Sequence, residues 1–199
     1  MKLSELITVF RTRDQLSLET IGDAVGVSKS TVSRWETGVI KKISLEKQKR
    51  LSDLFSIDVP EYLEHHFFKP VLGVVKAGYD LLADQNLMSY EEVSKREYDQ
   101  GDYFLEVKGD SMVGARIHDG DLIFVKHTAV LASGDIGVVL INGDEATVKR
   151  VVMKDDLLIL ESANPDYETR YFNEDDVMNL PVTIIGKVLN VRVVFESEA

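Results

Sequence analysis

The sequence predicts two domains of different class, an all-α N-terminal domain and a mainly-β C-terminal domain. Up to about residue 66, apolar residues recur with the spacing of a helix, and from residue 70 onward they alternate with the period of two that strands show. The charge changes with the pattern. Residues 1–50 carry ten Lys and Arg against six Asp and Glu, whereas residues 67–199 carry thirteen against twenty-four. We therefore expect a first domain at residues 1–66, a linker at 67–72 and a second domain at 73–199.

Five helices are expected in the first domain, each supported by periodicity or by a capping residue. Ser17 and Ser28 are suited to cap helices at their N-termini, and Gly26 and Gly38 are suited to end them. The fifth helix begins at Val59, next to a proline in its first turn. The expected helices lie, in order, at residues 3–10, 18–25, 29–37, 45–55 and 59–63.

The second and third helices are joined by a glycine turn, which is the helix-turn-helix arrangement. Gly22 is small enough for the two helices to cross closely, and Val32 and Trp35 lie three apart and can face the core. The outer face of the third helix then carries Lys29, Ser30, Ser33 and Arg34. Arg and Lys bind guanine and Ser binds several bases, so we expect this face to contact double-stranded operator DNA. The alternative is ordinary helix packing with a solvated polar face.

The stretch from Val27 to Gly38 resembles the recognition-helix signature of the phage-repressor (Cro/CI, or XRE) class, and the resemblance covers about residues 3–64. It implies that Lys29, Ser30 and Arg34 face bases and that Ser28 lies near a phosphate. One position departs from the family: Leu18 stands where a phosphate-binding Gln is common. Such domains generally act in pairs about one DNA turn apart, so a homodimer is expected.

Seven strands are expected in the second domain, separated by Gly-Asp, Asn-Gly and Asp-Asp turn signals. They lie at residues 71–75, 103–107, 122–125, 136–141, 146–152, 157–160 and 182–195. Residues 79–100 show neither periodicity and are interpreted as a long loop. Residues 182–195 are expected to offer a pairing edge for the dimer.

Ser111 and Lys149 are the candidate catalytic residues. Ser111 follows a strand at a Gly-Asp turn, and Lys149 lies inside an apolar strand, where burial would lower its pKa. A neutral lysine can take the proton of a serine hydroxyl, so this pair needs no histidine. Each residue also has a common structural explanation, since serines are frequent in turns and strand lysines usually extend to solvent.

The run Gly109-Asp110-Ser111-Met112, followed by residues 117–121 and then by Lys149, resembles the self-cleaving domain of LexA, phage CI-type repressors and UmuD. The resemblance implies that Ser111 is the nucleophile, Lys149 the base, and the N–H groups of Ser111 and Met112 the oxyanion donors. It also implies a scissile Ala-Gly bond, and Ala77–Gly78 is the one such pair in the chain. By the same resemblance the trigger is a RecA filament. Gly114-Ala115 departs from the proline-containing turn of many relatives.

The residue composition excludes several other classes of protein and of functional site. The chain contains no cysteine, which excludes a disulfide scaffold, a zinc–thiolate site and a thiol nucleophile. Its four histidines are not spaced as metal ligands, and we expect neither a metal nor a cofactor. No membrane span or secretory signal is visible, so a cytoplasmic protein is expected. Three alternatives stay open: a non-cleaving repressor whose β domain dimerises or binds an antirepressor, a regulator with a cupin-type ligand barrel, and a protease acting on other proteins.

Overall fold

The computed structural model describes residues 1–73, 86–142, 146–173, 175–176 and 182–195. The chain divides into two compact units. Unit 1 comprises Met1–Lys69 and Ser89–Asp99, and unit 2 comprises Pro70–Met88 and Gln100–Ala199. Strand β1 (Phe67–Leu72), which covers the predicted linker, contributes residues to both units.

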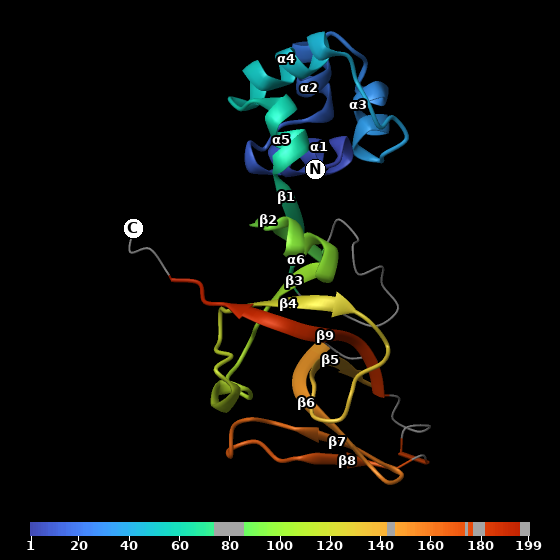
Figure 1. Cartoon of the computed structure of the whole chain (residues 1–199), viewed down its shortest axis with the longest axis vertical. Coiled ribbons are helices and arrows are strands. Elements are labelled where there is room, and N and C mark those ends of the chain that lie inside the picture. The colour runs from blue at the N-terminus through green and yellow to red at the C-terminus, as the bar shows by residue number, and fades with distance from the viewer. Residues whose placement is uncertain (74–85, 143–145, 174, 177–181, 196–199) are drawn as a thin grey trace. The chain divides into compact units, whose positions relative to one another are not determined.

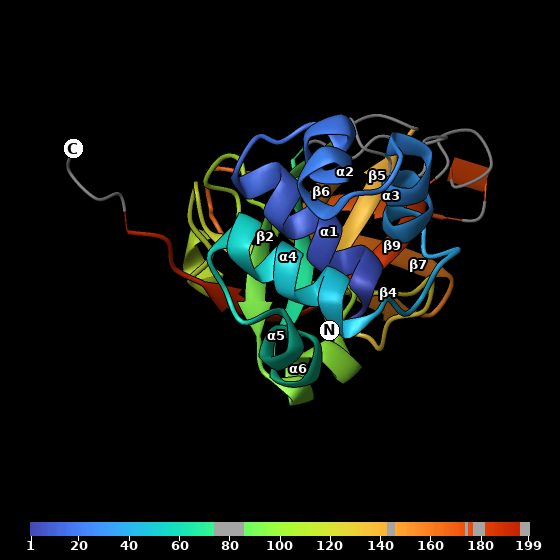
Figure 2. The same cartoon turned by 90° about the horizontal axis from the view of Figure 1, so that it is seen from above.

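All five predicted helices are present in unit 1, and Figures 1 and 2 show α2 and α3 packed side by side. Ser17 and Ser28 cap α2 and α3 as predicted, because each hydroxyl accepts a hydrogen bond from the N–H three residues on. Gly26 ends α2 with a left-handed φ of 76°. The helices are α1 (Leu3–Arg13), α2 (Leu18–Val25), α3 (Lys29–Glu36), α4 (Leu45–Phe55) and α5 (Val59–His65).

The core of unit 1 forms around residues that lie at helical spacing in the sequence. Val32 and Trp35 are buried, as the helix-turn-helix interpretation requires. A Cβ on Gly22 would lie 2.7 Å from the Val27 carbonyl oxygen, so only glycine allows this close approach of α2 to the following turn. Arg11 on α1 donates to Glu36 on α3 at 2.6 Å, which ties the third helix to the first.

The interpretation of residues 79–100 as a long loop is wrong where the structure describes them. Strand β2 (Leu87–Val93) and helix α6 (Lys95–Gln100) occupy the second part of this stretch. The helix starts with a capping box: Glu97 N–H donates to Ser94 Oγ, and a Glu97 carboxylate oxygen accepts from Ser94 N–H. This local signal was available in the sequence as Ser-Lys-Arg-Glu, but so short a helix carries no apolar periodicity.

The strands form a nine-stranded sheet in the order β2-β1-β3-β4-β9-β5-β6-β7-β8, and β3 to β9 belong to unit 2. β1 pairs with β3 in parallel, whereas the pairs from β3 to β8 are antiparallel. Six of the predicted strands are present, and the last of them ends earlier than expected, at Arg192. The strand predicted at residues 71–75 overlaps β1 at Val71 and Leu72, and its residues 74–75 lie outside the described residues. Both β2 and the short β8 were missed. The remaining strands are β3 (Tyr103–Glu106), β4 (Leu122–His127), β5 (Ile136–Ile141), β6 (Ala146–Lys154), β7 (Leu157–Glu161), β8 (Arg170–Phe172) and β9 (Val182–Arg192).

The expectation that residues 182–195 form a free pairing edge is wrong for most of the segment. β9 lies between β4 and β5, so both of its sides are occupied by neighbouring strands. The exposed part is the short stretch that follows, where Val193, Val194 and Phe195 are 60%, 52% and 86% exposed. Within this segment, only residues 193–195 are left to pair with a second chain.

Candidate functional site

Ser111 lies in a tight turn that follows β3, and the turn is held by hydrogen bonds on both sides. Gly109, with a φ of 84°, donates its N–H to Asp119 Oδ1 at 2.6 Å. Gly120 N–H donates a hydrogen bond to the Val107 carbonyl oxygen at 3.0 Å. Immediately after Ser111, the side chain of Met112 is buried in the unit 2 core. The serine is therefore presented by a backbone that cannot shift without disturbing the core.

Lys149 reaches the serine from β6. In the sheet register it stands opposite Gly137 on β5, and alternation along the strand places Thr147 and Lys149 on the same face. Its Nζ donates to Ser111 Oγ at 2.8 Å across 38 residues of sequence. The structure thus brings together the two residues that the sequence singled out.

The surroundings of Lys149 favour its neutral form. Burial is the main cause that lowers the pKa of the ammonium group, and the positive charge of Arg170 lowers the pKa further. Both effects act in the direction that a general base requires, because a protonated lysine cannot accept the serine proton.

Residues 163–167, in the loop after β7, clamp the serine turn. Asn164 Nδ2 donates to the Asp110 carbonyl at 3.2 Å, and Tyr167 Oη donates to the Asp110 carboxylate at 2.5 Å. Gly114 N–H donates to the Ala163 carbonyl at 2.7 Å. The ring of Tyr167 also lies beneath the lysine, with its centroid 5.7 Å from Lys149 Nζ. Sequence reasoning missed this clamp, although Asn-Pro at residues 164–165 is a turn signal.

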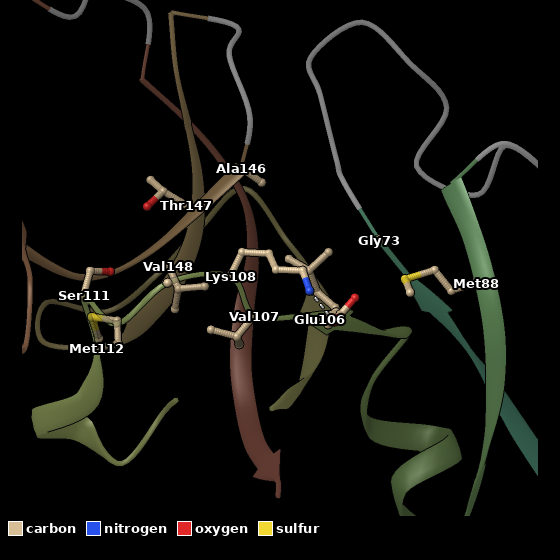
Figure 3. A pocket seen from close by; sticks show the side chains of 12 residues that line it. Gly73, Met88, Glu106, Val107, Lys108, Ser111, Met112, Ala146, Thr147 and Val148 are labelled. Atoms are coloured by element: carbon tan, nitrogen blue, oxygen red, sulfur yellow. Dashed lines mark hydrogen bonds and ion pairs between the residues drawn. The ribbon is translucent and has the colours of Figure 1, made fainter. Parts of the chain in front are cut away.

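Two hollows meet at the Ser–Lys pair. The first, of about 290 Å³, has Ser111 and Met112 on one side and Gly73 and Met88 on the other, with Val148 between them (Figure 3). The second, of about 380 Å³, is lined by Lys149, Ser162, Tyr167, Arg170 and four further residues. The first hollow therefore extends from the serine to the end of β1, where the chain leads toward the predicted cleavage site.

The predicted cleavage site, Ala77 and Gly78, lies outside the described residues. Gly73 is the last residue described before it and lines the first hollow. The predicted oxyanion donors are the N–H groups of Ser111 and Met112. Within the described part of the chain, neither has a hydrogen-bond acceptor in the protein, so both are available to a substrate oxygen.

The predicted DNA-contacting residues share one outer surface of α3 and its cap. Ser28, Lys29, Ser30 and Arg34 are exposed and Ser33 is partly exposed. The Ser28 hydroxyl caps the helix and also lies 2.9 Å from the Ser30 hydroxyl. Among the residues that the structure describes, no acidic side chain forms an ion pair with Lys29 or Arg34. Their charges are thus free to meet a phosphate or a guanine edge.

Neither a metal site nor a membrane-spanning helix is present in the described ranges. No group of three or more His, Cys, Asp or Glu side chains there is arranged to hold a metal ion. No helix in the same ranges combines the length and hydropathy needed to cross a membrane.

Comparisons with known proteins match the two parts of the chain separately. A family model described as Peptidase S24-like matches residues 70–189, and one described as Helix-turn-helix matches residues 10–62. A solved structure described as "Crystal Structure of FeII HppE" shares 12% identity and covers 96% of this chain and 97% of that chain. Its TM-score is 0.29, so it carries no argument about fold or function.

Proposed function

Because the chain belongs to the Peptidase S24-like family and carries a helix-turn-helix domain, we propose that it is a dimeric repressor that inactivates itself by autoproteolysis at Ala77–Gly78. The two matches together support a repressor of the LexA/CI type. One observation carries the cleavage step: the amine of Lys149 lies 2.8 Å from the hydroxyl of Ser111 in an environment that favours the neutral amine.

In the proposed reaction, neutral Lys149 removes the proton from Ser111 Oγ while the oxygen attacks the carbonyl carbon of Ala77. The N–H groups of Ser111 and Met112 donate to the oxyanion. As the C–N bond breaks, Lys149 passes its proton to the amine of Gly78. Water, deprotonated by Lys149, then attacks the ester carbonyl carbon. As the ester C–O bond breaks, Lys149 returns this proton to Ser111 Oγ, and the Ala77 carboxylate is released. Each protein molecule reacts once, on its own chain.

Operator binding is assigned to the exposed face of α3. Lys29, Ser30, Ser33 and Arg34 are positioned to contact base edges, with Ser28 near a phosphate. Residues 67–199 carry a large excess of Asp and Glu, so the second unit would be repelled by DNA and contact would be confined to the first. This assignment places the repressor with its operator in the cytoplasm.

Dimerisation is assigned to unit 2, with the exposed apolar residues Val193, Val194 and Phe195 as the proposed contact. Two linked DNA-binding units gain affinity from their joint attachment, and breaking the chain between the units removes the covalent part of that linkage. The proposed trigger is a RecA filament or an antirepressor. Such a trigger would act by raising the population of molecules in which the cleavage site occupies the hollow beside Ser111.

The test is a self-cleavage time course on purified protein between about pH 7 and 10, with and without activated RecA, beside Ser111→Ala and Lys149→Ala. Mass spectrometry should find fragments ending at Ala77 and beginning at Gly78, and both should be absent from the variants. A chain that stays intact under every condition while still binding operator would refute autoproteolysis and favour a repressor controlled by an antirepressor.

A further inference from the structure

The chain on each side of the proposed cleavage site contributes a segment to the other unit. Residues 70–73, before the site, belong to unit 2, and residues 89–99, after the site, belong to unit 1. A cut anywhere between Gly73 and Asn86 leaves β1 on the N-terminal fragment and leaves β2, α6 and β3 on the C-terminal fragment. In the sheet, however, β1 lies between β2 and β3. Each fragment therefore keeps a segment that is built into the unit formed mainly by the other.

Within unit 2, the end of β1 is a core strand. Val71 pairs in parallel with Phe104, and Leu72 pairs with Leu105. Val71 is 3% exposed and Leu72 is fully buried. Gly73 adds a backbone bond by donating to the Asn86 carbonyl at 3.0 Å. Removing this strand would expose two apolar side chains and the unpaired backbone groups of a sheet interior.

Within unit 1, residues 89–99 pack against the helical part. Tyr98 Oη donates to Glu5 on α1 at 2.6 Å, and burial raises the pKa of this phenol. The ring of Phe67 lies 5.2 Å from the ring of Tyr98, between centroids. Glu92 bonds His66 Nδ1 at 2.5 Å. These contacts join positions that lie on opposite sides of the cleavage site in sequence.

We infer that cutting the chain does not by itself release the DNA-binding unit, because the two fragments bind each other through β1 and through the surface that holds residues 89–99. The partner of this surface is the C-terminal fragment of the same molecule. Release from the operator then takes two steps, peptide bond cleavage and fragment dissociation. The cut converts an intramolecular contact into a bimolecular one, so dissociation becomes concentration-dependent and can be completed by dilution.

This inference rests on the proposed function only for the place of the cut, so it can be tested without autoproteolysis. The recognition sequence of a site-specific protease is placed within residues 78–84 of the full-length Ser111→Ala protein, and the purified protein is nicked with that protease. Size-exclusion chromatography at micromolar concentration should give one peak containing both fragments, which separate in about 6 M guanidinium. Operator affinity soon after nicking should stay within about threefold of the uncut protein, by the affinity relation. Fragments that elute separately without denaturant would overturn the inference while leaving the Ser–Lys chemistry untouched.

A matched set of tyrosine variants tests the contacts that residues 89–99 make with the helical part of unit 1. Tyr98→Ala should shorten the lifetime of the nicked complex by about fivefold or more, as expected for loss of a packed ring and a bond to a charged group. Tyr98→Phe, which keeps the ring, should have a smaller effect. Tyr171→Ala, at a 61% exposed tyrosine on β8, should match the parent protein. Equal lifetimes for all four nicked proteins would refute the contribution of residues 89–99.

Discussion

Gly114 should be intolerant of even one added methyl group, because of how close the chain passes to the loop after β7. A Cβ at this position would lie 2.1 Å from the carbonyl oxygen of Ala163 and 3.2 Å from its carbonyl carbon, both backbone atoms. The same carbonyl accepts the 2.7 Å hydrogen bond from Gly114 N–H. Gly114→Ala must therefore push the two segments apart. We expect a cost of about 1–3 kcal/mol for the overpacking and about 1 kcal/mol for the lost bond, or roughly 2–4 kcal/mol in total.

The assay is guanidinium unfolding of Gly114→Ala in the Ser111→Ala background, which prevents self-cleavage. The single tryptophan, Trp35, is buried in unit 1, so its fluorescence follows unit 1, whereas the strand signal in circular dichroism follows unit 2. The substitution should lower the midpoint of the second signal and leave the first unchanged. Gly109→Ala is the matched control, since no atom lies within 4 Å of its added Cβ and its φ of 84° costs about 1–2 kcal/mol.

The same substitution, with Ser111 restored, should slow self-cleavage by tenfold or more, because the displaced loop carries two of the hydrogen-bond donors to Asp110. A Gly114→Ala protein as stable as Gly109→Ala would refute the reasoning about close approach. Normal cleavage despite a large loss of stability would refute the link from this loop to the serine.

Four further predictions concern the site and the DNA-binding face. The cleavage rate should rise with pH and level off below the ordinary lysine pKa of about 10.4, since neutral Lys149 is the reactive form and its folded pKa is lowered. Arg170→Gln removes a charge that lowers this pKa, so the midpoint of the pH–rate profile should move to higher pH; an unchanged midpoint would count against that electrostatic role. Tyr167→Phe should slow cleavage by about three- to tenfold through loss of the bond to Asp110, and a rate equal to wild type would show that the bond does not position the serine. Arg34→Gln should weaken operator binding by about 1–3 kcal/mol in a titration at constant salt, with Arg96→Gln on α6 as the matched control.

Local features of this protein were predictable because their causes are local. Ser17, Ser28 and Gly26 set the ends of α2 and α3 through hydrogen bonds to residues two to four positions away. The helix ends can therefore be predicted from these residue types and their neighbours. The capping box at Ser94 and Glu97 is equally local, and it was missed because a search for apolar periodicity cannot see a six-residue helix without a buried stripe. The edge predicted at residues 182–195 failed for another reason: alternation shows that a strand exists, but not which strands lie beside it.

The two-domain plan and the ends of the helix-turn-helix follow from the sequence, since both depend on residue type and short-range spacing. Ser111 and Lys149 lie 38 residues apart, so residue type and the resemblance of the surrounding motif to a known family were needed to pair them. The support of that pair, in contrast, comes from contacts between distant parts of the chain. The clamp of Asn164 and Tyr167 on Asp110, and the cation of Arg170 near Lys149, depend on the antiparallel register that aligns β6 with β7 and β7 with β8. Likewise, the insertion of β1 between β2 and β3 depends on a parallel pairing of distant segments. Such pairings are stabilised by the whole sheet and not by neighbours in the chain, so no stretch of sequence specifies them by itself.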